Sequence, residues 1–414
     1  MRARPWFIAA SANLFRLFGV WRSLVARSVR VGEVPSSNLG TPMERRAAFA
    51  RLFLYRARVL RALATIAAAV APVFGVGGGR VTVDGAPAFP VLAYYQCDGS
   101  ARAAAAAGVD FFVEQPYTAC SPLRPNDFAS FPPPPGVAVL TDDPAAPSPS
   151  GGWYLPDEPD ALGVTASRLP QLPPAAETGR LRVVNVSQHF FSGQALVRPG
   201  YDLAEYARFA GVADLVGFDL YPIVKFCGRI PLLDVFRAQR ELATTYAPGK
   251  PTFQWIETGP MTGECPTLEV TPAVANAEAW LAVAGGAVGI GWFTAAWPAG
   301  GPWQRWAVGP AMLAQLTATD ARLHALAPVL TAPWLPVAFA DRGGVAASAR
   351  VSGGARYVSA VNSTAATVTV PLRVPGLGHR TLSVLDESRI VRSTAAGVFH
   401  DRFAPYAVHL YRAG

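Results

Sequence analysis

Two glutamates in the middle of the chain have the residue type and the setting for acid–base chemistry. Glu158 follows the aromatic segment Gly152-Trp-Tyr-Leu-Pro-Asp-Glu-Pro159, and Glu257 ends the apolar segment Phe253-Gln-Trp-Ile-Glu257. Glycoside hydrolysis needs two carboxyl groups, one protonated to release the leaving oxygen and one ionised to act at the anomeric carbon. For Glu158 a helix-capping role is the alternative, because an acid at a helix N-terminus interacts favourably with the helix dipole.

Other polar and aromatic residues stand at or just beyond the ends of apolar segments. Carboxylates and amides bind sugar hydroxyls, and aromatic rings cover the apolar faces of sugars. Lys is almost absent from these positions, which suits a neutral oligo- or polysaccharide ligand. For His189 a packed or rim position is the alternative, and for Asp219 support of the rim. The candidate substrate-binding residues are Tyr95, Gln115, Asp157, Gln188, His189, Asp219, Tyr221, Trp292 and Trp297.

Eight apolar, β-rich segments precede these residues and predict strands. They are Val91–Tyr95, Val109–Val113, Val137–Leu140, Trp153–Leu155, Leu181–Val186, Leu215–Leu220, Thr252–Ile256 and Val288–Phe293. Segments typical of helices alternate with many of them, namely Ser100–Ala107, Leu203–Phe209, Leu232–Tyr246 and Thr271–Ala284. Nearly continuous apolar strands alternating with helices indicate a parallel sheet buried on both faces, and eight of them favour a (β/α)8 TIM barrel of the α/β class. The segment Asp142–Ser150 shows no helix between the third and fourth strands.

The chain on either side of the barrel has a different pattern. Arg80–Pro90 alternates around Asp84-Gly85, which predicts a β-hairpin. From Thr331 short alternating segments predict a small antiparallel β-sandwich. These segments are Val345–Val351, Ala355–Val361, Ala366–Leu372, Arg380–Leu385 and Tyr406–Tyr411. The predicted domains are therefore a leader at 1–79, a barrel at 80–330 and a sandwich at 331–414.

The leader has two parts. The segment 31–42 looks like translation through the end of a transfer-RNA gene, which predicts a true start at Met43; a disordered basic extension is the alternative. Residues 44–61 hold six Arg, and the apolar segment Ala62–Ala71 and small residues follow, as in a secretory signal. We expect a secreted or cell-surface protein. The chain would be attached to a membrane only if the leader stays uncleaved as an anchor.

The distribution of charge and the absence of two motifs exclude several classes of function. The net charge of +8 comes from the leader: residues 1–74 carry 12 Arg and two acids, and the remainder has 24 basic against 26 acidic residues. The body therefore lacks the basic surface that nucleic-acid binding requires. No Gly-x-Gly-x-x-Gly follows the first predicted strand, and the chain has no Gly-x-Ser-x-Gly, so we expect neither a dinucleotide cofactor nor a serine nucleophile.

The body of the chain contains four cysteines, Cys97, Cys120, Cys227 and Cys265. An even number in an exported chain permits two disulfides. Of three possible pairings we prefer Cys97–Cys120 and Cys227–Cys265, because each would join neighbouring loops of the barrel. A zinc site fits less well, since no two cysteines are close in sequence and no His is near them. We expect no metal.

Over residues 80–414 the pattern resembles the clan of retaining glycoside hydrolases with (β/α)8 barrels, including β-galactosidase-like enzymes. Asp157-Glu158-Pro159 is similar to the Asn-Glu-Pro triplet of that clan, and the Asp84-Gly85 hairpin resembles the strand pair before many of its barrels. The resemblance implies that Glu158, after strand four, is the acid/base and that Glu257, after strand seven, is the nucleophile. It also implies that Tyr221 hydrogen-bonds the nucleophile.

The resemblance further implies that Trp292 or Trp297 forms the floor of the first sugar subsite. Asp157 departs from the clan's pattern, because an ionised Asp can accept but not donate a hydrogen bond, and its charge would raise the pKa of Glu158. The sequence thus predicts an exported two-glutamate glycoside hydrolase. A non-catalytic carbohydrate-binding or cell-surface protein on the same barrel stays open, as does a structural protein attached to the cell surface through its sandwich.

Overall fold

The computed structural model describes residues 72–94, 98–113, 133–144, 150–194, 201–259, 265, 268–296, 306–336 and 342–414. Residues 74–414 form one compact unit. Residues 1–71 of the predicted leader lie outside the described residues. In the part of the chain that is described, no helix is both long and apolar enough to cross a bilayer.

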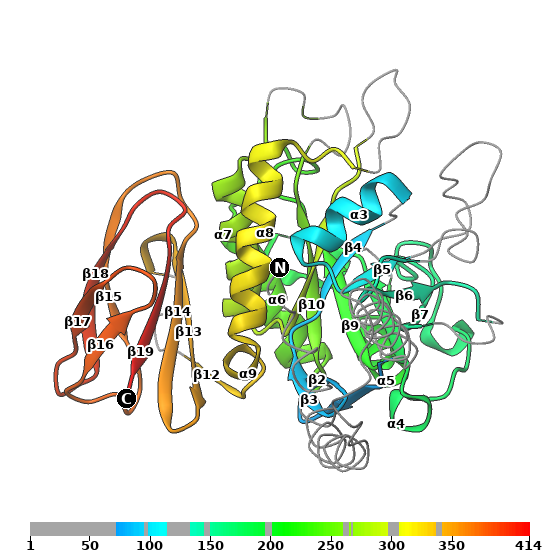
Figure 1. Ribbon diagram of the computed structural model, residues 1–414, viewed down its shortest axis with the longest axis horizontal. Coiled ribbons are helices and arrows are strands. Elements are labelled where there is room, and N and C mark those ends of the chain that lie inside the picture. The colour runs from blue at the N-terminus through cyan, green and yellow to red at the C-terminus, as the bar shows by residue number, and fades with distance from the viewer. Residues whose placement is uncertain are drawn as a thin grey trace, which may run out of the picture. The chain divides into compact units, whose positions relative to one another are not determined.

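Eight parallel strands close into a barrel, in the order β10-β11-β4-β5-β6-β7-β8-β9 (Figure 1). All eight predicted strands are present, and the predicted α/β fold with a TIM-type barrel is confirmed. The strands are β4 (Val91–Tyr94), β5 (Phe111–Val113), β6 (Ala138–Thr141), β7 (Gly152–Tyr154), β8 (Leu181–Val186), β9 (Leu215–Asp219), β10 (Thr252–Glu257) and β11 (Gly289–Phe293).

Helices pack around this barrel. They are α3 (Asp98–Ala107), α4 (Ala175–Thr178), α5 (Ala204–Val212), α6 (Leu233–Glu241), α7 (Pro272–Gly285), α8 (Pro310–Ala325) and α9 (Ala327–Leu330). The four predicted helices are confirmed, and the chain continues from α6 as a π-helical turn over Leu242–Tyr246. Helix α8 was not predicted. Between β6 and β7 the described residues contain no helix, as the Pro/Ser-rich sequence indicated.

Glycines make room for the aromatic side chains inside the barrel. A Cβ on Gly291 would lie 2.3 Å from the ring of Trp255, and one on Gly217 would lie 2.1 Å from the ring of Phe253. The Trp255 ring in turn contacts Tyr94 edge-on at 5.2 Å. Because side chains alternate along a strand, Phe253, Trp255 and Glu257 belong to the inward face of β10.

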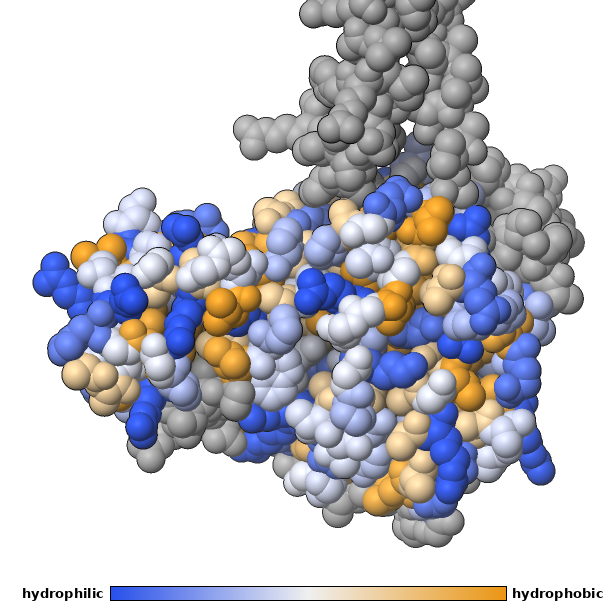
Figure 2. All heavy atoms as spheres, turned by 90° about the horizontal axis from the view of Figure 1, so that it is seen from below, coloured by the Kyte–Doolittle hydropathy of each residue, from blue (hydrophilic) through white to orange (hydrophobic). Residues whose placement is uncertain are grey.

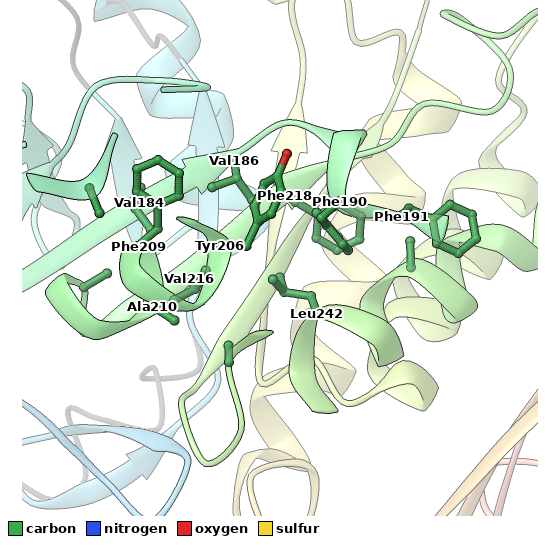
Figure 3. Close-up of a cluster of buried hydrophobic side chains, with 14 of the residues drawn as sticks. Val184, Val186, Phe190, Phe191, Tyr206, Phe209, Ala210, Val216, Phe218 and Leu242 are labelled. Carbon is green, nitrogen blue, oxygen red and sulfur yellow. The ribbon is translucent and has the colours of Figure 1, made fainter. Parts of the chain in front are cut away.

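An apolar cluster joins β8 and β9 to the helices outside them (Figure 3). Phe190 lies at its centre and contacts Tyr206 and Phe218 edge-on at 5.5 and 5.1 Å. Both Phe190 and Tyr206 are buried, and Tyr206 comes from α5. This packing fixes the position of the turn that follows β8, which contributes to the site described below.

A three-stranded antiparallel sheet precedes the barrel, formed by β1 (Phe74–Gly77), β2 (Arg80–Val83) and β3 (Ala86–Ala88). The predicted hairpin is confirmed: β2 and β3 meet at Asp84 and Gly85, which both have positive φ angles. The ring of Phe74 contacts that of Phe111 in β5, with centroids 4.9 Å apart. This small sheet therefore packs against the barrel.

The C-terminal residues form two antiparallel sheets, one of six strands in the order β12-β13-β14-β19-β16-β17 and one of two, β15-β18. The predicted sandwich is confirmed, and Leu372, Leu382 and Phe399 are among the residues of its core.

Among the coloured residues of Figure 2, hydrophilic and hydrophobic side chains are interspersed over the face shown.

The strands of the sandwich are β12 (Trp334–Pro336), β13 (Val345–Ser352), β14 (Ala355–Asn362), β15 (Val368–Arg373), β16 (Thr381–Val384), β17 (Arg389–Arg392), β18 (Val398–Phe403) and β19 (Val408–Ala413).

Helix α7 lies between the barrel and the sandwich, in contact with β10 on one side and with β13 and β14 on the other (Figure 1). Thr271 caps its start by accepting a hydrogen bond from Val274 N, and Gly286, with φ 114°, ends it. Arg350 of β13 is buried and donates from Nη2 to the carbonyl oxygen of Val283 at 2.9 Å. The sandwich thus satisfies a carbonyl of the last turn of this helix.

Candidate active site

The chain turns sharply after β7, and this turn carries Glu158. Glu158 has a φ of 44°, an unusual conformation for a residue other than glycine. Its amide donates to Asn185 O at 3.0 Å, and its carbonyl accepts from Leu162 N at 3.2 Å. Residues 157–163 form bends and turns, so Glu158 does not begin a helix and the helix-capping alternative does not apply.

Asp157 is held by donors from three strands of the barrel, β4, β7 and β8. Tyr94 OH donates to Oδ2 at 2.6 Å, while Tyr154 OH and Asn185 Nδ2 each donate to Oδ1 at 3.0 Å. Burial raises the pKa of Asp157, and the three hydrogen bonds oppose that rise. Both carboxyl oxygens are therefore engaged within the protein, which orients Asp157 firmly beside Glu158.

Glu158 faces a second carboxyl group, that of Asp219 at the end of β9. Burial, followed by the charges of Asp157 and Asp160, raises the pKa of Glu158 to about 7, although a hydrogen bond with Asp219 opposes the rise. Burial and then the charge of Glu158 raise the pKa of Asp219 well above its usual value. Two carboxyl groups in this position cannot both ionise easily, so they share a proton.

Tyr221 follows β9 and lies next to these acids. Its ring packs against Phe293 with centroids 5.4 Å apart, and only 5% of the residue is exposed. Burial and then the charge of Asp219 raise the pKa of Tyr221 well above 10, so its hydroxyl stays protonated. The charges of Glu158 and Glu257 raise the pKa of Tyr221 as well, so Tyr221 lies near both proposed catalytic residues.

Glu257 ends β10 and is fully buried. Its Oε1 accepts from Ile223 N at 2.8 Å and its Oε2 from Val224 N at 2.7 Å, both in the loop after β9. Burial raises the pKa of Glu257; the carboxyl of Glu278 on α7 and these two amides oppose the rise. Burial and the charge of Glu257 raise the pKa of Glu278 well above its usual value, so Glu278 is the neutral member of this pair.

The other predicted residues lie in several places. Gln188 and His189 follow β8 and are partly exposed. Trp292 is buried, and its Nε1 donates to Asp320 Oδ1 on α8 at 2.9 Å, so its side chain lies outside the strands and does not reach the barrel mouth. Tyr95, Gln115 and Trp297 lie outside the described residues.

A disulfide joins Cys227 to Cys265 with a Cα–Cα distance of 5.2 Å. This pairing was predicted and is confirmed. It links the loop after β9, which bonds Glu257, to the loop after β10. The second predicted pair, Cys97 and Cys120, falls outside the described residues.

The sequence analysis did not identify the residues whose hydrogen bonds hold the turn after β7 in place. Asp160, which is fully buried, accepts hydrogen bonds from Ser187 N at 2.9 Å, Ser187 Oγ at 2.5 Å and Tyr206 OH at 2.8 Å. Tyr94 was also missed, because nothing in the sequence shows which face of the first strand turns inward. Within the described residues, no group of three His, Cys, Asp or Glu side chains is arranged to hold a metal ion.

No protein-family model and no curated protein matches the chain. Among solved structures, it is similar to an α-amylase from Geobacillus thermoleovorans (12% identity over 78% of this chain and 98% of that one, TM-score 0.43). It is also similar to a GH30 endoxylanase from Clostridium papyrosolvens (12% identity, 82% and 99%, TM-score 0.43). An Anoxybacillus α-amylase shares 12% identity over 58% of this chain (TM-score 0.41), which spans about half, 53%, of that enzyme. At this level of similarity the residues at the barrel mouth, and not these structures, indicate the chemistry.

Proposed function

We propose that the chain is a glycoside hydrolase in which Glu158 donates the proton to the leaving oxygen. The observation that carries this proposal is the raised pKa of the Glu158 carboxyl group, about 7. This group is partly exposed and lies at the carboxyl end of a barrel strand. An acid with that pKa keeps its proton near neutral pH, as a general acid must.

Asp219 cannot be the second catalytic group while it is hydrogen-bonded to Glu158. In retaining enzymes the two carboxyl groups lie about 5–5.5 Å apart so that the anomeric carbon fits between them. A directly hydrogen-bonded pair leaves no such space. We therefore assign Asp219 to positioning: it shares a proton with Glu158, and their hydrogen bond orients the Glu158 carboxyl group.

Glu257 is then the proposed nucleophile. Two main-chain amides stabilise its charged form, and it ends the inward face of β10. Its carboxylate would form a bond to the anomeric carbon as the glycosidic C–O bond breaks and the leaving oxygen takes the proton of Glu158. Water would then displace Glu257 from the sugar, giving its proton to Glu158 and restoring both groups.

The residues around Glu158 support a sugar as the ligand. Asp219 offers its Oδ1, which can pair with a hydroxyl donor, and the rings of Tyr221 and Phe293 lie beside it. We propose oligo- or polysaccharide substrates on this ground. Export through the leader, with cleavage after the apolar segment, is proposed from the sequence.

Glu158→Gln and Glu257→Gln, assayed on a panel of neutral aryl glycosides, test the assignment. Loss of a general acid lowers turnover by about 10²–10⁴-fold, and we expect losses of at least that size with unchanged circular dichroism. Glu177→Gln in α4, an exposed acid remote from the site, is the matched control and should keep full activity. Near-normal turnover by either site variant would remove that residue from the mechanism.

The full burial of Glu257 favours one other candidate, a carbohydrate-binding protein without catalysis. In that protein Glu257 would serve only to hold the loop after β9 through Ile223 N and Val224 N. Calorimetric titration with the same glycosides separates the two candidates. Binding without turnover by the unaltered chain would favour the binding protein.

A further inference from the structure

A chain of hydrogen bonds runs from the buried carboxylate of Asp160 to the imidazole of His189. Ser187 lies between them: its hydroxyl donates to Asp160 Oδ2 at 2.5 Å, and its Oγ lies 2.7 Å from His189 Nδ1. Asp160 is fully buried, and its carboxylate also accepts from Ser187 N and Tyr206 OH. Asp160 bears on the proton transfer proposed above through its charge, which raises the pKa of Glu158, whereas Ser187 and His189 have no part in it.

The direction of the bonds follows from the number of donors available. A serine hydroxyl has one hydrogen and two acceptor lone pairs. The carboxylate can only accept, so the hydrogen of Ser187 points to Asp160. The Oγ lone pairs remain for His189, whose main-chain N donates to Oγ at 3.3 Å. His189 Nδ1 must therefore carry a hydrogen and donate it to Ser187.

This arrangement leaves Nε2 of a neutral His189 as a hydrogen-bond acceptor. No described residue bonds Nε2, and the His189 side chain is 31% exposed. His189 lies in the turn after β8, at the end of the barrel where Asn185 bonds both Asp157 and the main chain of Glu158. An acceptor at this place suits a hydroxyl group of a ligand bound beside Glu158.

We propose that Asp160 and Ser187 are positioning residues that fix His189 as the Nδ1–H tautomer, and that His189 Nε2 accepts a hydrogen bond from a sugar hydroxyl. The ligand part rests on the proposed function; the tautomer part does not. An acceptor of fixed direction makes His189 a specificity-determining residue, because a sugar without that hydroxyl would leave Nε2 unpaired.

Nitrogen-15 NMR of the full chain labelled at histidine tests the tautomer. The chain has five His, so single substitutions assign the signals. At a pH well above the usual imidazole pKa of about 6.5, His189 should show the pattern of a protonated Nδ1. In Asp160→Asn the amide can donate to Ser187 Oγ, which frees the serine hydrogen for His189 Nδ1, and the pattern should reverse to protonated Nε2. Tyr206→Phe, which keeps the carboxylate, is the matched control and should leave the tautomer unchanged. A protonated Nε2 in the unaltered chain would overturn the proposal.

Titration with neutral aryl glycosides and their monodeoxy analogues tests the ligand role. The Nε2 signal of His189 should shift when a full glycoside binds. His189→Phe should weaken binding of that glycoside about tenfold, as expected for one hydrogen bond, and should leave one deoxy analogue unaffected. A bound glycoside that leaves Nε2 unmoved would overturn the ligand role alone. If no glycoside binds, the ligand role fails with the proposed function, and the tautomer result is judged by itself.

Discussion

Replacing Glu158 should make the protein more stable at alkaline pH. Burial and the charges of Asp157 and Asp160 raise the pKa of Glu158 from 4.5 to about 7, so the folded state binds this proton more tightly than the unfolded state does. Stability must therefore fall as the pH rises from about 4.5 to about 7. At 1.36 kcal/mol per pH unit the fall amounts to about 3 kcal/mol, an upper value because the side chain is partly exposed.

Glu158→Gln lacks this titrating group and should escape the fall. The difference in free energy of unfolding between the variant and the unaltered chain should be smallest near pH 4.5 and should grow by up to about 3 kcal/mol by pH 8. Loss of the Glu158 charge also relieves Asp219, which changes stability in the same direction. A catalytic acid that destabilises the fold is a common compromise between activity and stability.

Urea denaturation across this pH range measures the effect. Glu177→Gln, the exposed control in α4, should show a small difference that does not vary with pH. If the Glu158→Gln difference is equally constant with pH, the carboxyl group is not perturbed in the folded protein, and the reasoning that makes it a general acid is refuted.

Two further variants test the framework of the site. Cys227→Ser combined with Cys265→Ser should lower the free energy of unfolding by about 4 kcal/mol, because the bridge closes a loop with a sequence separation of 38; thermal unfolding with and without reductant checks this, and a Tm insensitive to reductant would contradict it. Gly291→Ala should cost about 3 kcal/mol or more, because the new Cβ would meet the Trp255 ring at 2.3 Å. Gly309→Ala, whose Cβ would meet nothing within 4 Å, is the control, and equal urea midpoints for the two alanine variants would show that the barrel interior is not close-packed there.

The strands of the barrel could be predicted because each is buried on both faces and is therefore continuously apolar. Leu181–Val186 has the same bounds in sequence and structure. Helix α8 was missed, since Pro310–Ala325 buries only Met312, Leu316, Thr319, Asp320 and Leu323 and carries polar residues over the rest of its surface. Its start at Gly309-Pro310 was the available signal.

The sequence predicted that Glu158 and Glu257 lie at the ends of strands, but it did not predict which acidic side chains meet. The sequence indicated acids after the fourth and seventh strands, yet Glu158 meets Asp219 from the sixth. Pairing of β7 with β8 brings Asn185 to Asp157, whereas closure of the barrel brings Tyr94 from β4. The sequence pattern did not show in which direction the Trp292 side chain points. Side chains alternate between the two faces of β11, and Trp292 lies on the face that packs against α8, not on the face inside the barrel.

The position of α7 has a consequence for how this protein can change over evolution. Eleven of its residues are buried, because the barrel covers one side and the sandwich the other. A chain that ended at Leu330 would expose an apolar helix surface and would leave the Val283 carbonyl without Arg350. Residues 331–414 therefore cannot be deleted, or replaced by a domain from another protein, without exposing the buried surface of α7. A role of the sandwich in surface attachment would have to be tested by substitutions on its outer strands, with the domain left in place.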